Sequence, residues 1–382
     1  MTKEEKAVAA INAFLSGETV LAILTRFKCS KSWLYKWIKR YRSNPVGQWY
    51  EEQSKRPKTL RNTTSEQEKQ AIIAARLSLE AKPYSQRGAI SIQYELKAQQ
   101  QVVPPVWKIN KILKRANLNT KEPKDKKRTN EYPFIGTVID QMDFVGPRYV
   151  KNDGRYYSLN IIDITTHFVH INPFRSRETQ NVLQSVVRFW QQRGMPDFLQ
   201  MDNELSFRGS NRYPHSFSKL IRLALSLKIT VLFIPVQEPW RNGIIEKFND
   251  SFNRRFIKGK AYDDFSHLQV CAKEFEDFHN QHHRYTAHKN KTPNEQVTLE
   301  FARDRLPTDF VIPGTTLPLK EGKLILVRFI RSNLLLDVFG EKFLMPKHLE
   351  YSYVIALIDV EKQVLVVLRD NQIQWRTFYK IE

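Results

Sequence analysis

The fold is decided by three short segments of the sequence: Gln141-Met142-Asp143-Phe144, then Gln200-Met201-Asp202-Asn203-Glu204, then Pro239-Trp240-Arg241-Asn242-Gly243-Ile244-Ile245-Glu246. Each segment places one carboxylate beside an apolar stretch. The two aspartates come at the ends of strand-like runs, residues 137–139 and 198–201. Glu246 lies in the first turns of a helix whose start is indicated by Asn242-Gly243.

Three acids in this order indicate chemistry at phosphorus. Carboxylates that come together from distant segments repel one another unless a cation neutralises them. Mg²⁺ prefers oxygen ligands and usually takes one or two carboxylates together with substrate phosphate. Two metals held by shared acids form a clamp for in-line displacement. We therefore expect Asp143, Asp202 and Glu246 to converge on a metal-dependent phosphoryl-transfer site.

The same segments resemble the integrase core of DDE transposases and retroviral-type integrases, most closely the bacterial insertion-sequence transposases. In that family the motifs read Gln-x-Asp, Asp-Asn-Gly and Asn-Gly-x-x-Glu. The resemblance implies an RNase H-like fold, two Mg²⁺ or Mn²⁺ ions held by Asp143, Asp202 and Glu246, and transfer of DNA 3′ ends. It also implies a homo-oligomer on DNA and a bacterial, nucleoid-associated location in the cytoplasm. The chain departs from the family at Glu204, where the motif has glycine.

Glu238 competes for the position of the third acid, because the commonest spacing in the family falls on it. It precedes Pro239, however, and the residue before a proline avoids the helical region. Glu246 follows Asn-Gly within a helix, and an inserted loop at residues 208–215, dense in turn formers, explains the longer spacing. A lone glutamate on a helix is usually a solvent-facing residue, but three motifs in order argue against that alternative.

Composition favours a nucleic-acid partner. The 382 residues suffice for two to four domains, and the formal net charge is +21. Charge alone shows affinity for polyanions, a property that ribosome-associated and membrane-surface proteins share. No apolar run is long enough for a membrane span, and the N-terminus lacks the apolar core of a signal peptide. Cys29 and Cys271 form no zinc or disulfide pattern, which is consistent with a reducing cytosol.

Residues 4–42 show three apolar stripes at helical spacing, which predicts a helix-turn-helix unit. We expect the outer face of its third helix to contact double-stranded DNA, although a solvated basic helix in a small bundle is nearly as good an explanation. Base-edge contacts are expected from Ser32, Tyr35 and Lys36, and phosphate contacts from Lys39 and Arg40.

Residues 64–118 repeat the pattern, beginning with a capping box at Ser65 to Glu68. Pro104-Pro105 opens the third helix of this second unit. Its outer face bears Lys108, Lys111, Lys114 and Arg115, the expected DNA contacts. A basic run without apolar residues follows; it is usually a solvated linker, and it could also track phosphates.

The remaining chain alternates strands and helices and then changes to short β runs. Alternation predicts a mixed sheet with helices on both faces, in which Asp163 is structural. Around Glu246, we expect Ile245, Phe248, Phe252 and Phe256 to face the core, and Asn249 and Asn253 to face the site. Arg241, Lys247 and Arg254 are expected to hold DNA, and Trp240 to stack on a strand or to pack. His279, His282, His283 and His288 have no zinc spacing and are taken as structural or DNA-facing.

Six β runs from residue 323 onward suggest a small barrel that resembles the SH3-like domains of integrases. The predicted domain order is a helix-turn-helix unit (1–45), a linker (46–63), a second unit (64–118), a basic linker (119–131), the catalytic core (132–300), a linker (301–320) and the barrel (321–382).

The interpretation that accounts for all these features is that the chain is a DNA transposase, which cuts mobile-element ends and joins their 3′ ends to target DNA. Two other classes are left open by the sequence: a catalytically inactive, sequence-specific DNA-binding regulator, and a metal-dependent nuclease without strand transfer.

Overall fold

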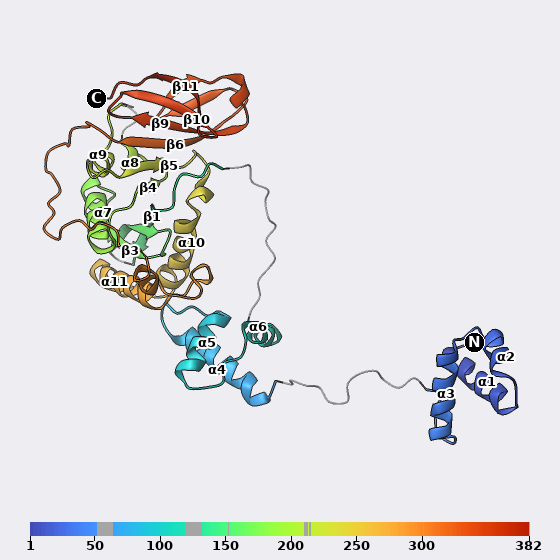
Figure 1. Cartoon of the computed structure of the whole chain (residues 1–382). Helices are drawn as coiled ribbons and strands as arrows, with labels where there is room; N and C mark the ends of the chain where they lie inside the picture. The colour runs from blue at the N-terminus through green and yellow to red at the C-terminus, as the bar shows by residue number, and fades with distance from the viewer. Residues whose placement is uncertain are drawn as a thin grey trace. The chain divides into compact units, whose positions relative to one another are not determined.

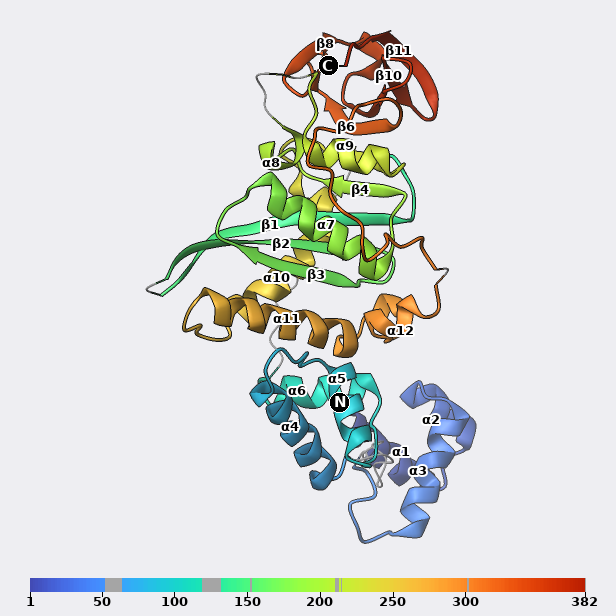
Figure 2. The same cartoon turned by 90° about the vertical axis from the view of Figure 1, so that its left-hand side faces the viewer.

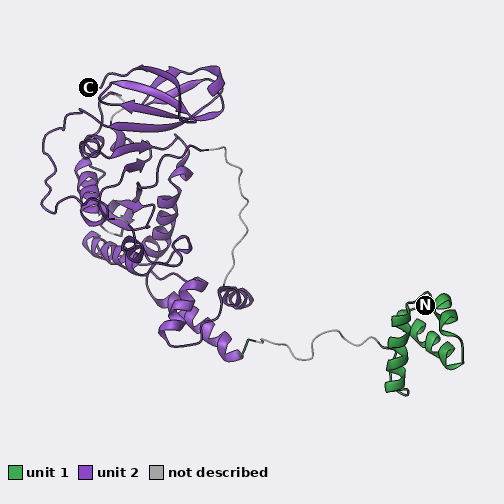
Figure 3. Ribbon diagram, in the orientation of Figure 1, with its two compact units in different colours: residues 1–65 green, residues 66–382 purple. Residues whose placement is uncertain are grey.

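The structure of the chain is a computed structural model that describes residues 1–51, 64–118, 132–151, 153–209, 213, 215–300 and 302–381. The predicted basic linker (119–131), most of the first linker (52–63) and part of the inserted loop (210–212 and 214) lie outside these residues. Two compact units are present, Met1–Ser65 and Glu66–Glu382 (Figure 3). No helix among the described residues is long and apolar enough to cross a membrane.

The first unit is the predicted bundle of three helices, α1 (Lys3–Leu15), α2 (Val20–Phe27) and α3 (Lys31–Ser43) (Figure 1). Its core contains Ile11, Ile23, Leu34 and Trp37, all at most 2% exposed. The Ser30 hydroxyl accepts a hydrogen bond from the Trp33 amide and so caps α3. This local cap fixes where the basic outer helix begins.

The second unit opens with α4 (Glu66–Ala81), α5 (Ala89–Ala98) and α6 (Val106–Arg115). Ile72, Ile92, Leu96, Ile109 and Leu113 form a small core of their own. The connection between α4 and α5 contacts α11 (Phe265–His282), where Tyr84 packs against Phe275, and the segment after it. There the Gln86 amide donates to the Arg284 carbonyl and accepts from the Arg284 amide.

A mixed sheet forms the centre of the second unit (Figure 2). Strands β1 (Ile139–Val150), β2 (Gly154–Asp163) and β3 (Val169–Phe174) run antiparallel in chain order. On the other side of β1 lie β4 (Phe198–Met201) and β5 (Thr230–Phe233), both parallel. In this parallel pair Gln200 of β4 lies opposite Gln141 of β1, two residues before Asp143.

Helices cover both faces of this sheet, as the alternating pattern predicted. α7 (Thr179–Arg193) and α9 (Lys219–Ser226) share one apolar cluster with the sheet. α10 (Gly243–Phe252) and α11 share a second cluster with Ile162, Val169 and Ile171 on the opposite face. The predicted inward stripe is confirmed: Ile245, Phe248, Phe252 and Phe256 are at most 3% exposed.

Shorter elements are α8 (Leu205–Arg208), α12 (Pro293–Val297), the 3₁₀ turns Pro239–Asn242, Thr286–His288 and Lys347–Leu349, and a π turn at Asn253–Ile257.

All six predicted C-terminal strands are present, but the separate barrel is not confirmed. β6 (Lys323–Ile330) pairs in parallel with β5 and leads into β9 (Ser352–Asp359), β10 (Val364–Arg369) and β11 (Gln372–Phe378). The result is one nine-stranded sheet, β11-β10-β9-β6-β5-β4-β1-β2-β3. β7 (Leu335–Val338) and β8 (Glu341–Leu344) form a separate hairpin. Pairing with β6 covers the edge of β5, which would otherwise expose unpaired amides and carbonyls.

Candidate active site

Asp143 lies on β1, opposite Asn160 of β2. The short apolar run predicts that Asp143 lies at the end of a strand, but the strand continues to Val150 and Asp143 lies within it. The prediction is wrong because β1 extends beyond the buried part of the sheet. The Asn249 side chain of α10 donates to Asp143 Oδ2 at 2.8 Å, and Asn160 donates to Asn249 at 2.8 Å. This relay fixes the carboxylate, and Asn249 faces the site as predicted.

Asp202 directly follows the last residue of β4, the parallel neighbour of β1. The Glu204 amide donates to Asp202 Oδ1 at 3.0 Å, which orients the carboxylate. Glu204 replaces the glycine of the family motif, yet its backbone angles are φ −64° and ψ 140°. Any residue adopts these angles, so the turn after Asp202 does not require glycine here.

Glu246 is positioned by the start of its helix. The Ile245 amide donates to Gln141 Oε1 at 3.0 Å, and the Asn242 side chain donates to the Met142 carbonyl at 3.2 Å. Gln200 of β4 donates to Asn242 Oδ1 at 3.1 Å. The glutamine two residues before each aspartate and the asparagine four residues before Glu246 thus hold β1, β4 and α10 together. These polar residues of the motifs have a positional role.

The three carboxylates share one electrostatic environment. Burial and the negative charges of Asp202 and Glu246 together raise the pKa of Asp143 to about 7, while hydrogen bonds from the Phe144 backbone and the Asn249 side chain oppose the shift. Burial also raises the pKa values of Asp202 and Glu246, and the charge of Arg177 lowers that of Asp202. An ionised Asp143 is therefore costly unless a cation joins it.

The donor set suits a hard divalent cation, because it consists of carboxylate oxygens without sulfur or imidazole. In the described ranges, however, no three His, Cys, Asp or Glu side chains are arranged so that they could hold a metal ion. The raised pKa of Asp143 is the observation that fits a cation at this position.

Glu238, the competing third acid, makes other contacts. Its carboxylate accepts hydrogen bonds from Arg241 Nε at 3.1 Å and from the Tyr353 hydroxyl at 2.7 Å. The Arg241 guanidinium lies 4.0 Å from the ring centre of Tyr132 and 4.9 Å from that of Tyr353. Glu238 is not among the charges that act on Asp143, whereas Glu246 is.

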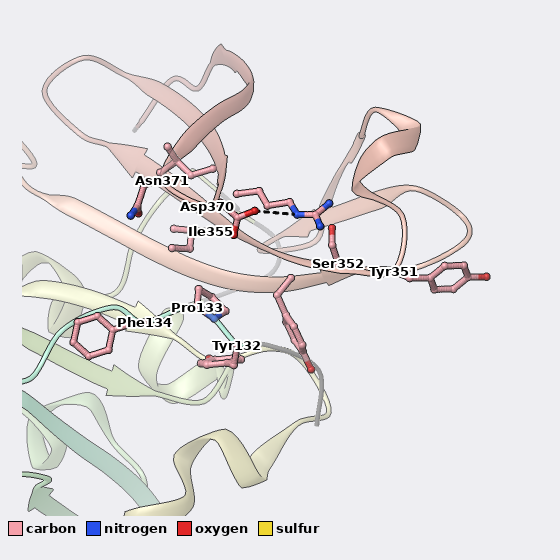
Figure 4. A pocket seen from close by; sticks show the side chains of 11 residues that line it. Tyr132, Pro133, Phe134, Tyr351, Ser352, Ile355, Asp370 and Asn371 are labelled. Carbon is pink, nitrogen blue, oxygen red and sulfur yellow. Dashed lines mark ion pairs between the residues drawn. The ribbon is translucent and has the colours of Figure 1, made fainter. Parts of the chain in front are cut away.

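Beside this cluster, residues 132–134 and the C-terminal strands line an open cavity of about 540 Å³ (Figure 4). Tyr132 and Tyr353 form part of its wall, and Phe134 and Tyr351 are 79% and 63% exposed. Arg241 was expected to hold DNA, but its guanidinium is engaged within the protein. Trp240 next to it is 56% exposed, so it is not a packing anchor.

The remaining candidate DNA contacts divide by their availability. On α3, Ser32, Tyr35, Lys36 and Lys39 are exposed, whereas Arg40 lies over the Trp37 ring at 4.7 Å and donates to the Glu51 carbonyl.

On α6, Lys111, Lys114 and Arg115 are exposed, whereas Lys108 pairs with Glu68 at 2.7 Å. Lys247 of α10 is exposed, and Arg254 pairs with Asp250 at 2.8 Å.

Asp163 lies in a buried ion-pair cluster away from the three acids. Arg303 bridges Asp163 and Asp140, at 2.6 and 2.8 Å, and Arg193 binds Asp163 at 2.6 Å and also Glu300. All the oxygens of Asp163 are therefore engaged, in keeping with a structural role.

The histidines also divide. His279 and His283 are buried, with Nε2 of His283 2.9 Å from the Tyr84 carbonyl and Nε2 of His279 3.4 Å from the His167 carbonyl. Burial lowers the pKa of His283 to about 3, which keeps it neutral. These two residues are structural, whereas His282 is exposed.

Two features of the site were not predicted from the sequence. Arg177, in the connection from β3 to α7, forms an ion pair with Glu204. Asn160 belongs to the relay that holds Asp143. A polar residue inside the otherwise apolar run of β2 was the available indication for Asn160, but nothing in the sequence around Arg177 distinguished it from other surface arginines.

Replacing Asn242 by Ala should displace the start of α10. Asn242 is 3% exposed, and its loss leaves the buried Met142 carbonyl without this donor. We expect a loss of about 1–3 kcal/mol in the free energy of unfolding, because a buried carbonyl loses its donor. Denaturant unfolding measures this loss. The control is Gln184→Ala, an exposed amide on α7; an equal loss in the two variants would contradict the positional role.

Two family models match the chain. The integrase core domain matches residues 227–293, and a homeodomain-like domain matches residues 1–48. The first range contains β5, α10 and α11 with Glu246, and the second contains the three-helix bundle. The resemblance to an integrase core and the N-terminal helix-turn-helix are thereby confirmed for these ranges. A comparison with curated proteins finds no match.

Solved structures of retroviral integrases are also similar. The catalytic core domain of BIV integrase is 14% identical, covering 43% of this chain and 95% of its own, with a TM-score of 0.33. The second structure is the simian T-cell lymphotropic virus intasome in complex with PP2A regulatory subunit B56 gamma. It is 14% identical over 75% of this chain and 92% of the matched chain, with a TM-score of 0.36. The trimeric HTLV-2 integrase catalytic core domain in complex with magnesium is 14% identical over 43% of this chain and 98% of the matched chain, with a TM-score of 0.32.

Proposed function

We propose that this chain is a DDE-type DNA transposase, which cleaves DNA at the ends of a mobile element and joins the 3′ ends to target DNA. The observation that supports it best is that the three acid-bearing segments are joined by hydrogen bonds: Gln141 of β1 accepts from the Ile245 amide, and Gln200 of β4 donates to Asn242 at the start of α10. In addition, the charges of Asp202 and Glu246 raise the pKa of the buried Asp143, a carboxylate that a bound cation would stabilise. The family match around Glu246 adds independent support.

In this proposal, Asp143, Asp202 and Glu246 together hold two Mg²⁺ or Mn²⁺ ions. Bound there, the metals would supply an activated water or 3′-hydroxyl and stabilise charge on the leaving 3′-oxygen. Asn249 keeps the Asp143 carboxylate oriented through its hydrogen bond to Oδ2. Gln141 and Asn242 keep the start of α10 against β1, so that Glu246 faces the same site.

The helical units would bring the acids to double-stranded DNA. The net charge of +21 and the exposed basic residues of α3 and α6 suit contacts to phosphates. Two units would cover a longer end sequence than one. Because two element ends must be joined to one target, we also propose a homo-oligomer on DNA, acting at the bacterial nucleoid in the cytoplasm.

The test is a joining reaction with purified protein, Mg²⁺, a labelled duplex carrying the element end and a target plasmid. Label joined to the plasmid is the expected product, and it should disappear when Mg²⁺ is removed with a chelator. Cleavage without joining would instead establish a metal-dependent nuclease. Shifted but intact DNA would indicate an inactive, sequence-specific regulator, which the presence of all three acids argues against.

The genomic flanks give an inexpensive second test. Inverted repeats bordered by short direct duplications beside the coding sequence are expected for a mobile element. The same repeats supply the end sequence for the joining reaction.

A further inference from the structure

We propose that Arg177 is the binding site for a backbone phosphate of the DNA strand at the three acids, and that Glu204 occupies this site as a resident anion until DNA arrives. The inference deepens the proposed function and rests on it. It concerns the ion pair of Arg177 with Glu204, the residue that stands where the family motif has glycine.

The pair links two distant segments of the chain. Arg177 lies between β3 and α7, and its Nη1 donates to Glu204 Oε1. Glu204 follows Asp202 by two residues, and its amide donates to the Asp202 carboxylate. The guanidinium is therefore tied to the turn that orients the second acid.

Aromatic rings hold the guanidinium in place. It lies 4.9 Å from the ring centre of Tyr157 and 5.9 Å from that of Phe144, the residue after Asp143. Phe144 in turn stacks on Phe207, with ring centres 5.1 Å apart and planes 5° apart. Cation–π contacts of this kind orient a guanidinium without consuming its hydrogen-bond donors. Arg177 is thus placed between the segments that bear the first two acids.

The side chain of Arg177 is 42% exposed and that of Glu204 is 24% exposed, so a ligand can reach the pair from solvent. The guanidinium fork binds carboxylates and phosphates in the same geometry, which lets one anion replace the other. A surface ion pair by itself contributes little to stability, so stability does not explain why this pair stands beside the acids.

The test is a double-mutant cycle on DNA binding by the full chain, measured by fluorescence anisotropy without divalent metal. The probes are a labelled duplex carrying the inverted repeat that borders the coding sequence, and a random duplex of equal length. The variants are Arg177→Ala, Glu204→Gln and the double variant. Matched controls are Arg188→Ala and Glu178→Gln, which change the same charges at exposed positions on α7 and at its N-cap.

With Arg177→Ala, we expect binding to weaken about 5- to 10-fold on both probes, and the slope of log affinity against log salt to fall by about 0.9, one phosphate contact. Glu204→Gln should tighten binding several-fold because Arg177 is released, and this gain should vanish in the double variant. Arg188→Ala and Glu178→Gln should show neither the slope change nor the coupling.

An unchanged salt slope in Arg177→Ala, or a gain from Glu204→Gln that persists without Arg177, would overturn the inference. Arg177→Lys keeps the charge without the fork and should restore part of the slope. Joining activity is measured separately. A parent protein that binds DNA but never joins it would contradict the proposed function, whereas the phosphate site is tested by the binding cycle alone.

Discussion

Replacing Asp143 by Asn is expected to abolish DNA joining, by about 10³-fold or more, while binding of element-end DNA persists. The carboxylate is the central member of the three acids, and the loss of a metal-stabilised transition state amounts to several kcal/mol. Joining rates and anisotropy measured on the same preparation separate chemistry from binding. Asp309→Asn, an exposed aspartate, is the control and should behave as the parent. Residual joining within tenfold of the parent would exclude Asp143 from the chemistry.

The same variant should be more stable than the parent when metal is absent. The folded-state pKa of Asp143 is about 7, above its unfolded value of about 3.9, so the folded chain binds the extra proton and stability falls as pH rises between these values. At pH 8 the whole penalty is present, and Asp143→Asn should raise the free energy of unfolding by roughly 2–4 kcal/mol. The gain should shrink toward pH 4. Mg²⁺ should stabilise the parent and have no such effect on the variant, as thermal melts would record.

Replacing Arg303 by Ala should destabilise the fold without touching the proposed site. Arg303 is 6% exposed and binds Asp140 and Asp163, which are both fully buried. Removing one partner of a buried pair leaves uncompensated charge and costs about 3–5 kcal/mol. Denaturant unfolding measures the loss. The neighbouring Arg305→Ala is the control, because Arg305 is exposed.

The loss in Arg303→Ala should depend on pH in a defined direction. Burial already raises the pKa of Asp140 to about 7, and Arg303 opposes that shift. Without Arg303 the folded-state pKa rises further above its unfolded value, so the destabilisation should be largest at pH 8 and smallest near pH 5. A loss that is independent of pH, or equal to that of Arg305→Ala, would contradict the role assigned to this cluster.

Much of the secondary structure followed from local patterns. The stripes at helical spacing predicted α1 to α6 and the buried face of α10, and the short β runs predicted all six C-terminal strands. Helix α11 was not identified, although Leu268, Ala272, Phe275 and His279 have helical spacing and are buried. The domain assignment at residues 321–382 did not anticipate the pairing of β6 with β5, because strand pairing is set by a distant edge and not by the strand's own sequence.

By itself, the sequence determined the order of the three acids, the glutamines and asparagine beside them, and the two basic helical units, because these depend on residue type and near-neighbour spacing. Only the tertiary structure decided the rest. It brought Asp202 and Glu246 close enough to Asp143 for their charges to raise its pKa. It also paired Arg241 with Glu238 and Arg177 with Glu204. These outcomes depend on distances between segments far apart in the chain, and such distances are fixed by how the sheet and helices pack.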